Sequence, residues 1–168
     1  MESAPGEGST FRLVLPGVPA QLPEPEPKPV AKSDLHGCGL ILAVDDEPGV
    51  RDFLRAILER YGYSVLTAEN GQDGVDVFRR SAETIAAVVL DLTMPVMGGS
   101  EAFRLMNEIR PGIPIVVSSG YGELSVRGQF AGTPAGVLKK PYTVSQLLDK
   151  LAAALGTCGY QPRLFSPE

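Results

Sequence analysis

Acidic residues at the ends of two apolar stretches are the side chains of this sequence best suited to chemistry. Asp45, Asp46 and Glu47 directly follow the stretch 40–44, and Asp91 ends a second, longer stretch. Carboxylates held close together repel one another unless a cation neutralises them. Mg2+ prefers oxygen ligands and bridges from carboxylates to phosphoryl groups. These acids therefore predict a Mg2+ site, provided that the fold brings them together.

Hydroxyl and ammonium groups follow two further apolar stretches. Ser118 and Ser119 end one of them, and Lys140 follows the last one. Each residue also has an ordinary interpretation: Asp46 could cap a helix, Ser119 could bond to the backbone, and Lys140 could be a solvated lysine before a proline. Four apolar stretches end in polar groups, which are in chain order an acid pair, a single acid, a pair of hydroxyl groups and a lysine. This joint pattern favours one shared site over four separate coincidences.

Short strands that alternate with helices must position these side chains. The apolar stretches predict strands at 40–44, 64–68, 85–90, 114–118 and 136–138. Helical patterns fall at 50–61, 71–81, 100–109, 123–129 (the weakest) and 144–155, the last with Thr143 as N-cap and Gly156 as its stop. This alternation predicts an α/β fold, a doubly wound five-stranded parallel sheet with helices on both faces. For this sheet we expect the flavodoxin-like strand order 2-1-3-4-5. Because parallel strands share a carboxyl end, the polar residues should meet at one edge.

Composition narrows the function further. The chain has 168 residues and a formal net charge of −5, without a block of basic residues, which argues against direct nucleic-acid binding. No stretch reaches the roughly 20 apolar residues of a membrane span, and the first residues lack the pattern of a secretory signal. Cys38 and Cys158 lack metal-ligand spacing and suit free thiols, although a disulfide between them is conceivable. We expect a cytoplasmic protein.

Residues 39–156 resemble the receiver domain of two-component response regulators. The resemblance rests on LAVDDEP at 42–48, DLTMPVMGG at 91–99, VVSSGY at 116–121 and LKKPYT at 138–143. The motifs SSGY and KKPYT together are most similar to those of receivers fused to the carboxyl end of hybrid sensor kinases. The resemblance therefore implies a receiver domain in a phosphorelay, with a hybrid kinase as its expected origin.

The resemblance also implies roles for the acids. Asp91 would be the phosphoacceptor, which takes a phosphoryl group from a phosphohistidine of a histidine kinase or a histidine phosphotransfer protein. Asp46 and Asp91 would bind Mg2+ directly, Asp45 would act largely through water, and the backbone carbonyl of Thr93 would complete the protein ligands. We expect the protein to be a monomer or a weak dimer.

Further roles are implied for the residues around the phosphoryl group. Lys140 would neutralise charge on the phosphoryl oxygens, and Ser119 would hydrogen-bond to the bound phosphoryl group and so change the conformation. Receivers commonly have an aromatic residue three positions before this lysine, whereas this sequence has Val137. Switching through an aromatic side chain would then depend on Tyr121 or Tyr142.

The segments outside the receiver carry weaker signals. Residues 1–16 include PGEGSTFRLVLP, which resembles the closing turn and strand of the ATP-binding domain of sensor histidine kinases, with a turn at 6–8 and a strand at 10–15. A disordered leader is the alternative. Residues 17–38 form a proline-rich linker, because proline cannot continue a helix or donate to a strand ladder. Residues 157–168 form a tail too short for an effector domain.

Other functions fit the sequence less well. A Mg2+-dependent phosphohydrolase with an aspartyl nucleophile typically has a second acid two residues after the nucleophile, where this chain has Thr93. A nucleotide-binding module needs a glycine-rich loop at the position of the acid pair. A docking domain without chemistry and a stand-alone single-domain response regulator stay open. His36 lacks a helical dimerisation segment around it, so we expect a phosphoacceptor rather than a kinase.

Overall fold

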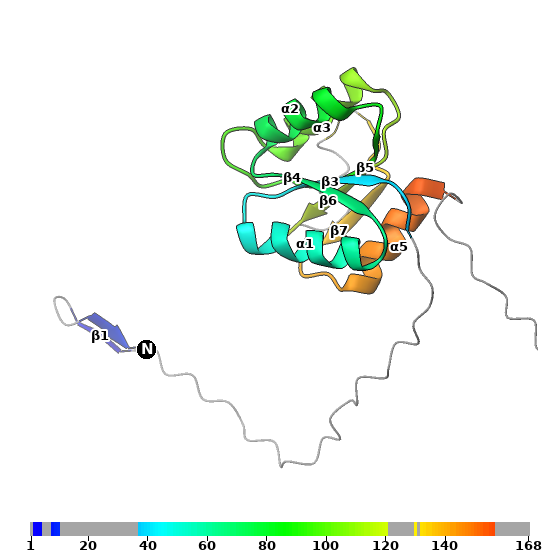
Figure 1. The fold of residues 1–168 in the computed structure, drawn as a ribbon. Coiled ribbons are helices and arrows are strands. Elements are labelled where there is room, and N and C mark those ends of the chain that lie inside the picture. Colours follow the sequence, from blue (N-terminus) through cyan, green and yellow to red (C-terminus); the bar gives the residue numbers. More distant parts are fainter. Residues whose placement is uncertain (1, 5–7, 11–36, 121–129, 131, 157–168) are drawn as a thin grey trace, which may run out of the picture. The chain divides into compact units, whose positions relative to one another are not determined.

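The computed structural model describes residues 2–4, 8–10, 37–120, 130 and 132–156 of a chain that divides into two compact units, Met1–Lys32 and Ser33–Glu168 (Figure 1). In the first unit, β1 (Glu2–Ala4) pairs antiparallel with β2 (Gly8–Thr10). The prediction of a turn through residue 8 is therefore wrong at that residue, because Gly8 is already paired in β2. The predicted strand at 10–15 lies outside the described residues except for its first residue.

Five parallel strands form the sheet of the second unit. They are β3 (Leu40–Val44), β4 (Ser64–Ala68), β5 (Ile85–Asp91), β6 (Ile115–Ser119) and β7 (Gly136–Lys139). Their order across the sheet is β4-β3-β5-β6-β7, and every neighbouring pair is parallel. The predicted order 2-1-3-4-5 is confirmed.

Helices cover both faces of this sheet (Figure 1). They are α1 (Pro48–Arg60), α2 (Gly71–Ser81), α3 (Gly99–Ile109) and α5 (Val144–Leu155). Figure 1 shows α2 and α3 on one side of the strands and α1 and α5 on the other. The predicted weak helix at 123–129 lies outside the described residues. Among the described residues, no helix is long and apolar enough to cross a membrane.

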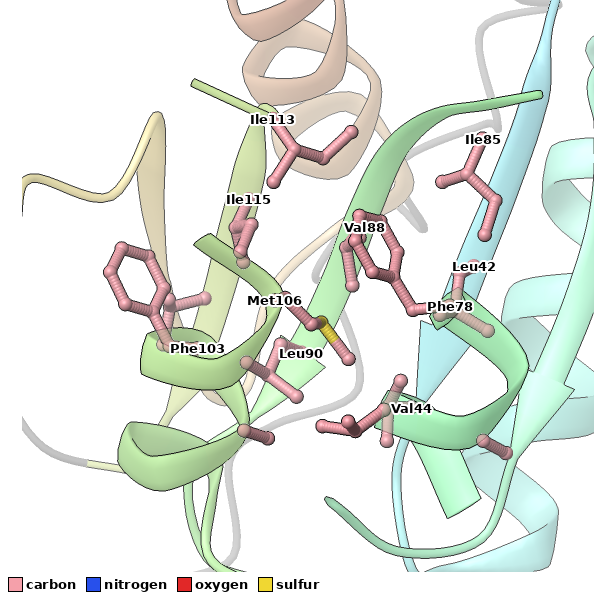
Figure 2. Close-up of a cluster of buried hydrophobic side chains, with 14 of the residues drawn as sticks. Leu42, Val44, Phe78, Ile85, Val88, Leu90, Phe103, Met106, Ile113 and Ile115 are labelled. Carbon is pink, nitrogen blue, oxygen red and sulfur yellow. The ribbon is translucent and has the colours of Figure 1, made fainter. Parts of the chain in front are cut away.

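Each face of the sheet has its own hydrophobic core. Against α2 and α3, Phe78, Phe103 and Met106 pack on alternate strand residues such as Leu42 and Leu90 (Figure 2). On the opposite face the intervening strand residues pack against the buried leucines of α1 and α5, Leu54, Leu58, Leu147 and Leu151. Strands buried on both faces explain why the apolar stretches are continuous instead of alternating.

Local signals set the helix ends. The side-chain oxygen of Asn70 accepts a hydrogen bond from the backbone N–H of Asp73 at 2.9 Å, which begins α2. Thr143 is the N-cap of α5, as predicted, and it forms a capping box with Gln146. Gly156 follows the last helical residue with φ +65°.

Candidate functional site

The carboxyl edge of the sheet brings the three predicted aspartates together. One carboxylate oxygen each from Asp45, Asp46 and Asp91 lies within 4.8 Å of the others. Asp45 follows β3 and Asp91 ends β5, and these side chains are only 1% and 5% exposed, whereas Asp46 is exposed. Val44 pairs with Leu90 in the register of β3 and β5, so Asp45 and Asp91, which follow them, lie side by side. The predicted acidic cluster is therefore present.

Lys140 lies between two of these acids. Its Nζ is 2.9 Å from Asp45 Oδ2 and 3.1 Å from Asp91 Oδ1. Its backbone N–H donates to the carbonyl of Ser119 at 2.8 Å, which ties the end of β7 to the end of β6. The sequence places this lysine 95 residues from Asp45, and the parallel topology brings the two together.

Burial and charge shift the pKa values of this cluster in a consistent way. Burial raises the pKa of Asp91, and the nearby charge of Asp45 adds to that rise, while Lys140 opposes it. Burial alone would lower the pKa of Lys140, but its hydrogen bond to Asp45 and the charges of both acids outweigh it, so the pKa is raised. Lys140 therefore stays an ammonium group at neutral pH, beside acids whose repulsion it offsets only in part.

The charge balance and the ligand type fit a hard divalent cation. Three carboxylates share one ammonium group, and two of the acids are withdrawn from water, which is costly for unpaired charge. Oxygen atoms gathered at one point are the ligands that Mg2+ prefers. Thr93, whose carbonyl was predicted as a further ligand, is exposed in the loop two residues after Asp91.

The two serines at the end of β6 are both buried. Ser118 pairs with Asp91 in the register of the sheet, and its hydroxyl donates to Asp91 Oδ1 over a long distance of 3.4 Å. Ser119, which was predicted to bind the phosphoryl group, is fully buried at the same edge, and its carbonyl accepts from Lys140. Sequence reasoning named both serines but did not predict the contact of Ser118, because only the strand register shows it.

The loop before α1 shows that Asp46 does not cap that helix. Glu47 holds the N-cap position, and within the described part of the chain no side-chain hydrogen bond caps this helix. Asp45 Oδ1 instead accepts from the backbone N–H of Glu47 at 3.0 Å. The ordinary interpretation of Asp46 as a helix cap is therefore wrong, since Pro48 begins the helix one residue later than that role requires.

Arg51 is a residue near the site that the sequence analysis missed. Its Nη1 donates to the backbone carbonyls of Asp45, at 2.8 Å, and Asp46, at 2.9 Å. The only signal in the sequence is its place in the first turns of the helix that follows the acids. A side chain that bonds to backbone leaves no pairing pattern from which the contact could be predicted.

The loop after Asp91 is held by close backbone packing. The N–H of Gly99 donates to the carbonyl of Leu92 at 3.1 Å. A Cβ at Gly99 would lie 2.2 Å from the carbonyl oxygen of Asp91, so only glycine fits there. Val96, in the same loop, has φ +68° and is 87% exposed. The backbone at Gly99 therefore packs directly against the backbone of Asp91, without room for a side chain between them.

An apolar groove of about 440 Å3 borders the acidic cluster. Val50 and Phe53 of α1 line one part of it, and Lys140, Pro141 and Tyr142 line the other. Phe53 is 41% exposed, a large share for an aromatic side chain. Burial raises the pKa of Tyr142. The groove thus joins an exposed aromatic side chain to the lysine of the site.

The position of the missing switch aromatic is buried. Val137 lies on β7 beside Val117 and is 9% exposed, in the core cluster that also contains Phe103. Phe130 packs against Phe103 with ring centroids 4.6 Å apart, a contact that the sequence analysis did not predict. Tyr121, one of the two suggested substitutes, lies outside the described residues.

Comparison with known proteins agrees with this geometry. The model of the response regulator receiver domain family matches residues 41–152. The sensor kinase CckA of Brucella abortus is 30% identical in an alignment of 154 positions, which covers 87% of this chain but only 16% of that kinase. A receiver domain protein from Clostridium thermocellum is similar with a TM-score of 0.66 and 27% identity, over 70% of this chain and 94% of that one.

A further solved structure shares the fold. The receiver domain of the Pseudomonas aeruginosa sensor histidine kinase PA1611, which has a magnesium ion in its active-site cleft, has a TM-score of 0.64 at 24% identity, over 71% of this chain and 98% of that one. The family match covers most of the described sheet and all of the predicted site residues. The chain therefore belongs to the response regulator receiver domains, the phosphoacceptor domains of two-component signalling.

Proposed function

We propose that Asp91 is the phosphoacceptor and that Asp45, Asp46, Asp91 and the carbonyl of Thr93 hold Mg2+ beside it. The donor would be a phosphohistidine on a histidine kinase or a histidine phosphotransfer protein. The observation that carries this proposal is the position of the Asp91 carboxylate, buried at the strand end among two further acids and 3.1 Å from Lys140. Asp45 is also buried and in contact with Lys140, but both of its carboxylate oxygens are engaged, Oδ1 by the backbone N–H of Glu47 and Oδ2 by Lys140.

The transfer needs little covalent help from the protein. A carboxylate oxygen of Asp91 attacks phosphorus, an O–P bond forms, and the P–N bond to the donor imidazole breaks, with its electron pair left on nitrogen. Mg2+, when bound, would neutralise charge on the phosphoryl oxygens. Lys140 is already beside Asp91 and offsets the negative charge that gathers there, and Ser119 would donate a hydrogen bond to the transferred group.

The apolar groove next to the site supports a protein as the donor. A phosphohistidine must reach the buried carboxylate of Asp91, so a donor protein has to approach the carboxyl edge of the sheet, which the groove borders through Lys140. Phe53 and Tyr142 present apolar surface there, within the groove that Lys140 also lines. We propose that the donor protein contacts this groove. We also propose that the reaction takes place in the cytoplasm and that the receiver is a monomer or a weak dimer.

The origin of the chain is a second part of the proposal. The match to CckA spans 87% of this chain, whereas the family model covers residues 41–152, so the similarity extends outside the receiver. This supports a receiver at the carboxyl end of a hybrid sensor histidine kinase, with residues 1–16 as the end of its ATP-binding domain. A stand-alone response regulator is the alternative. An in-frame kinase core encoded upstream would support the first, and a stop codon there would support the second.

Incubation with Mg2+ and a small acyl-phosphate donor tests the site directly. Intact mass should show one added phosphoryl group, and the label should vanish in Asp91→Asn and fade when Mg2+ is chelated. Asp149→Asn, a change at an exposed acid of α5, is the matched control and should keep the label. Labelling that survives Asp91→Asn would move the nucleophile elsewhere. Steady turnover of phosphate esters would instead favour the phosphohydrolase.

A further inference from the structure

Arg51 binds the backbone of the acid loop, and not the acids themselves. Its Nη1 donates to two successive carbonyls, those of Asp45 and Asp46, at 2.8 and 2.9 Å. Two successive carbonyls of an extended chain point in opposite directions, so one nitrogen can reach both only if the backbone turns between them. Charge-assisted hydrogen bonds of this length are among the stronger ones in proteins. Arg51 therefore favours the turned backbone of this loop.

This turn decides where the two carboxylates lie. Asp45 is directed into the protein, where Oδ1 accepts from Glu47 N–H and Oδ2 contacts Lys140, while Asp46 is exposed. An exposed aspartate in a loop would lose rotational freedom when it binds a cation, and that loss weakens binding. Arg51 reduces the loss because it already holds the backbone on both sides of the Asp45–Asp46 peptide bond.

The contact leaves the carboxylate oxygens available. Among the residues that the structure describes, Arg51 forms no ion pair with Asp45, Asp46 or Asp91. An arginine bonded to those carboxylates would compete with a cation for the same oxygens. An arginine bonded to carbonyls instead orients the acids and leaves their oxygens to a metal ion.

We propose that Arg51 is a positioning residue for the cation site, which sets Mg2+ affinity through the backbone carbonyls of Asp45 and Asp46. The proposal rests on the proposed function, since it assumes that these acids bind Mg2+. Partners that orient metal ligands typically change metal affinity by about 10- to 100-fold when they are removed. Replacement of Arg51 should therefore weaken Mg2+ binding about tenfold or more.

The same fold offers a matched control at the opposite edge of the sheet. Arg110, after α3, donates from Nη1 to the carbonyls of Ala82 and Ile85, both at 2.7 Å. Like Arg51→Gln, Arg110→Gln removes one positive charge and two hydrogen bonds to backbone carbonyls, but it does so away from the acids. Arg55→Gln, on the exposed side of α1, controls for loss of charge on the same helix.

The test is Mg2+ titration of isotope-labelled protein without a phosphodonor, followed by amide NMR shifts, with thermal midpoints recorded for each variant. We expect Arg51→Gln to bind Mg2+ about tenfold more weakly and the Glu47 amide to exchange faster, while both control variants bind like wild type. If Arg51→Gln does not fold, Arg51→Lys should show a smaller loss of affinity. Wild-type affinity in every folded Arg51 variant, or an equal loss in Arg110→Gln, would overturn the positioning role. Wild-type protein that does not bind Mg2+ would refute the proposed function instead.

Discussion

The carboxyl and amino ends of the parallel strands, which form the carboxyl edge and the amino edge of the sheet, share one kind of contact but differ in what it supports. At each edge one arginine nitrogen bridges two backbone carbonyls, Arg51 beside the acids and Arg110 behind α3. The carboxyl edge also holds two buried acids, Asp45 and Asp91, with the partly exposed Lys140 in contact with both. At the amino edge the described loops turn through glycines, including Gly62 and Gly112, at positive φ.

The difference shows what buried charge requires of a fold. A buried charge is tolerated only when its partners are held in place, so the carboxyl edge depends on contacts between strands far apart in the sequence. The amino edge combines local turns with backbone hydrogen bonds such as those of Arg110, and among the described residues no charged side chain is buried there. Changes at the carboxyl edge should therefore affect phosphorylation and cation binding, whereas equivalent changes at the amino edge should affect stability alone.

Replacement of Lys140 should have the largest effect. Lys140→Met leaves Asp45 and Asp91 buried without their ammonium partner, so phosphoryl labelling should fall about a hundredfold. The free energy of unfolding should fall by about 3 kcal/mol without Mg2+, and Mg2+ should restore part of it. Lys139→Met, at the exposed neighbour, should change neither. Equal labelling rates in the two variants would separate Lys140 from the chemistry.

Two glycines provide a second contrast between the edges. Gly99→Ala would place a Cβ 2.2 Å from the carbonyl oxygen of Asp91, so the backbone must move and both stability and labelling should fall. Gly112→Ala meets no atom within 4 Å but has φ +80°, so it should cost about 1 kcal/mol of stability through backbone strain. Denaturant melts and labelling rates on both variants measure the contrast. If Gly112→Ala lowers the labelling rate more than its loss of stability explains, the contrast between the two edges would be wrong.

Sequence patterns predicted the features that depend on local residue order. The strand 64–68 and the helix 71–81 agree with the structure to the residue, because apolar period and end signals lie within each segment. The convergence of Asp45, Asp91 and Lys140 also followed, because parallel strands share a carboxyl end. The contact of Arg51 with backbone could not be predicted in this way, since any loop offers carbonyls and no residue type marks those that are bound.

The first unit and the serines show the same limit. The hairpin of β1 and β2 was missed because the segments 2–4 and 8–10 are short and carry no apolar alternation that would mark them as strands. The choice between Ser118 and Ser119 as the partner of Asp91 depends on register, and a shift of one residue reverses which side chain faces which neighbour. Contacts between elements decide both cases, and a single sequence does not contain them.

Cation binding should stabilise the protein through Asp46. With Mg2+ at ten times its dissociation constant, the free energy of unfolding should rise by roughly 1.4 kcal/mol in wild type and much less in Asp46→Asn. Asp46 does not cap α1, and its replacement removes one of three mutually repelling charges, so the variant should be at least as stable as wild type when the cation is chelated. Thermal melts with Mg2+ and with a chelator measure both quantities. The same gain in Asp46→Asn as in wild type would remove Asp46 from the ligand set.

The smallest effect should come from Ser118. Its hydroxyl donates to Asp91 Oδ1 over 3.4 Å, longer than a strong O–H···O bond, and Lys140 contacts the same oxygen at 3.1 Å. Ser118→Ala should therefore lower stability by about 1 kcal/mol or less, and labelling by severalfold at most. Ser119→Ala should slow labelling more, if Ser119 and not Ser118 binds the phosphoryl group. Parallel labelling rates distinguish the two serines, and a larger loss in Ser118→Ala would transfer the phosphoryl contact to the residue that faces Asp91 in the sheet register.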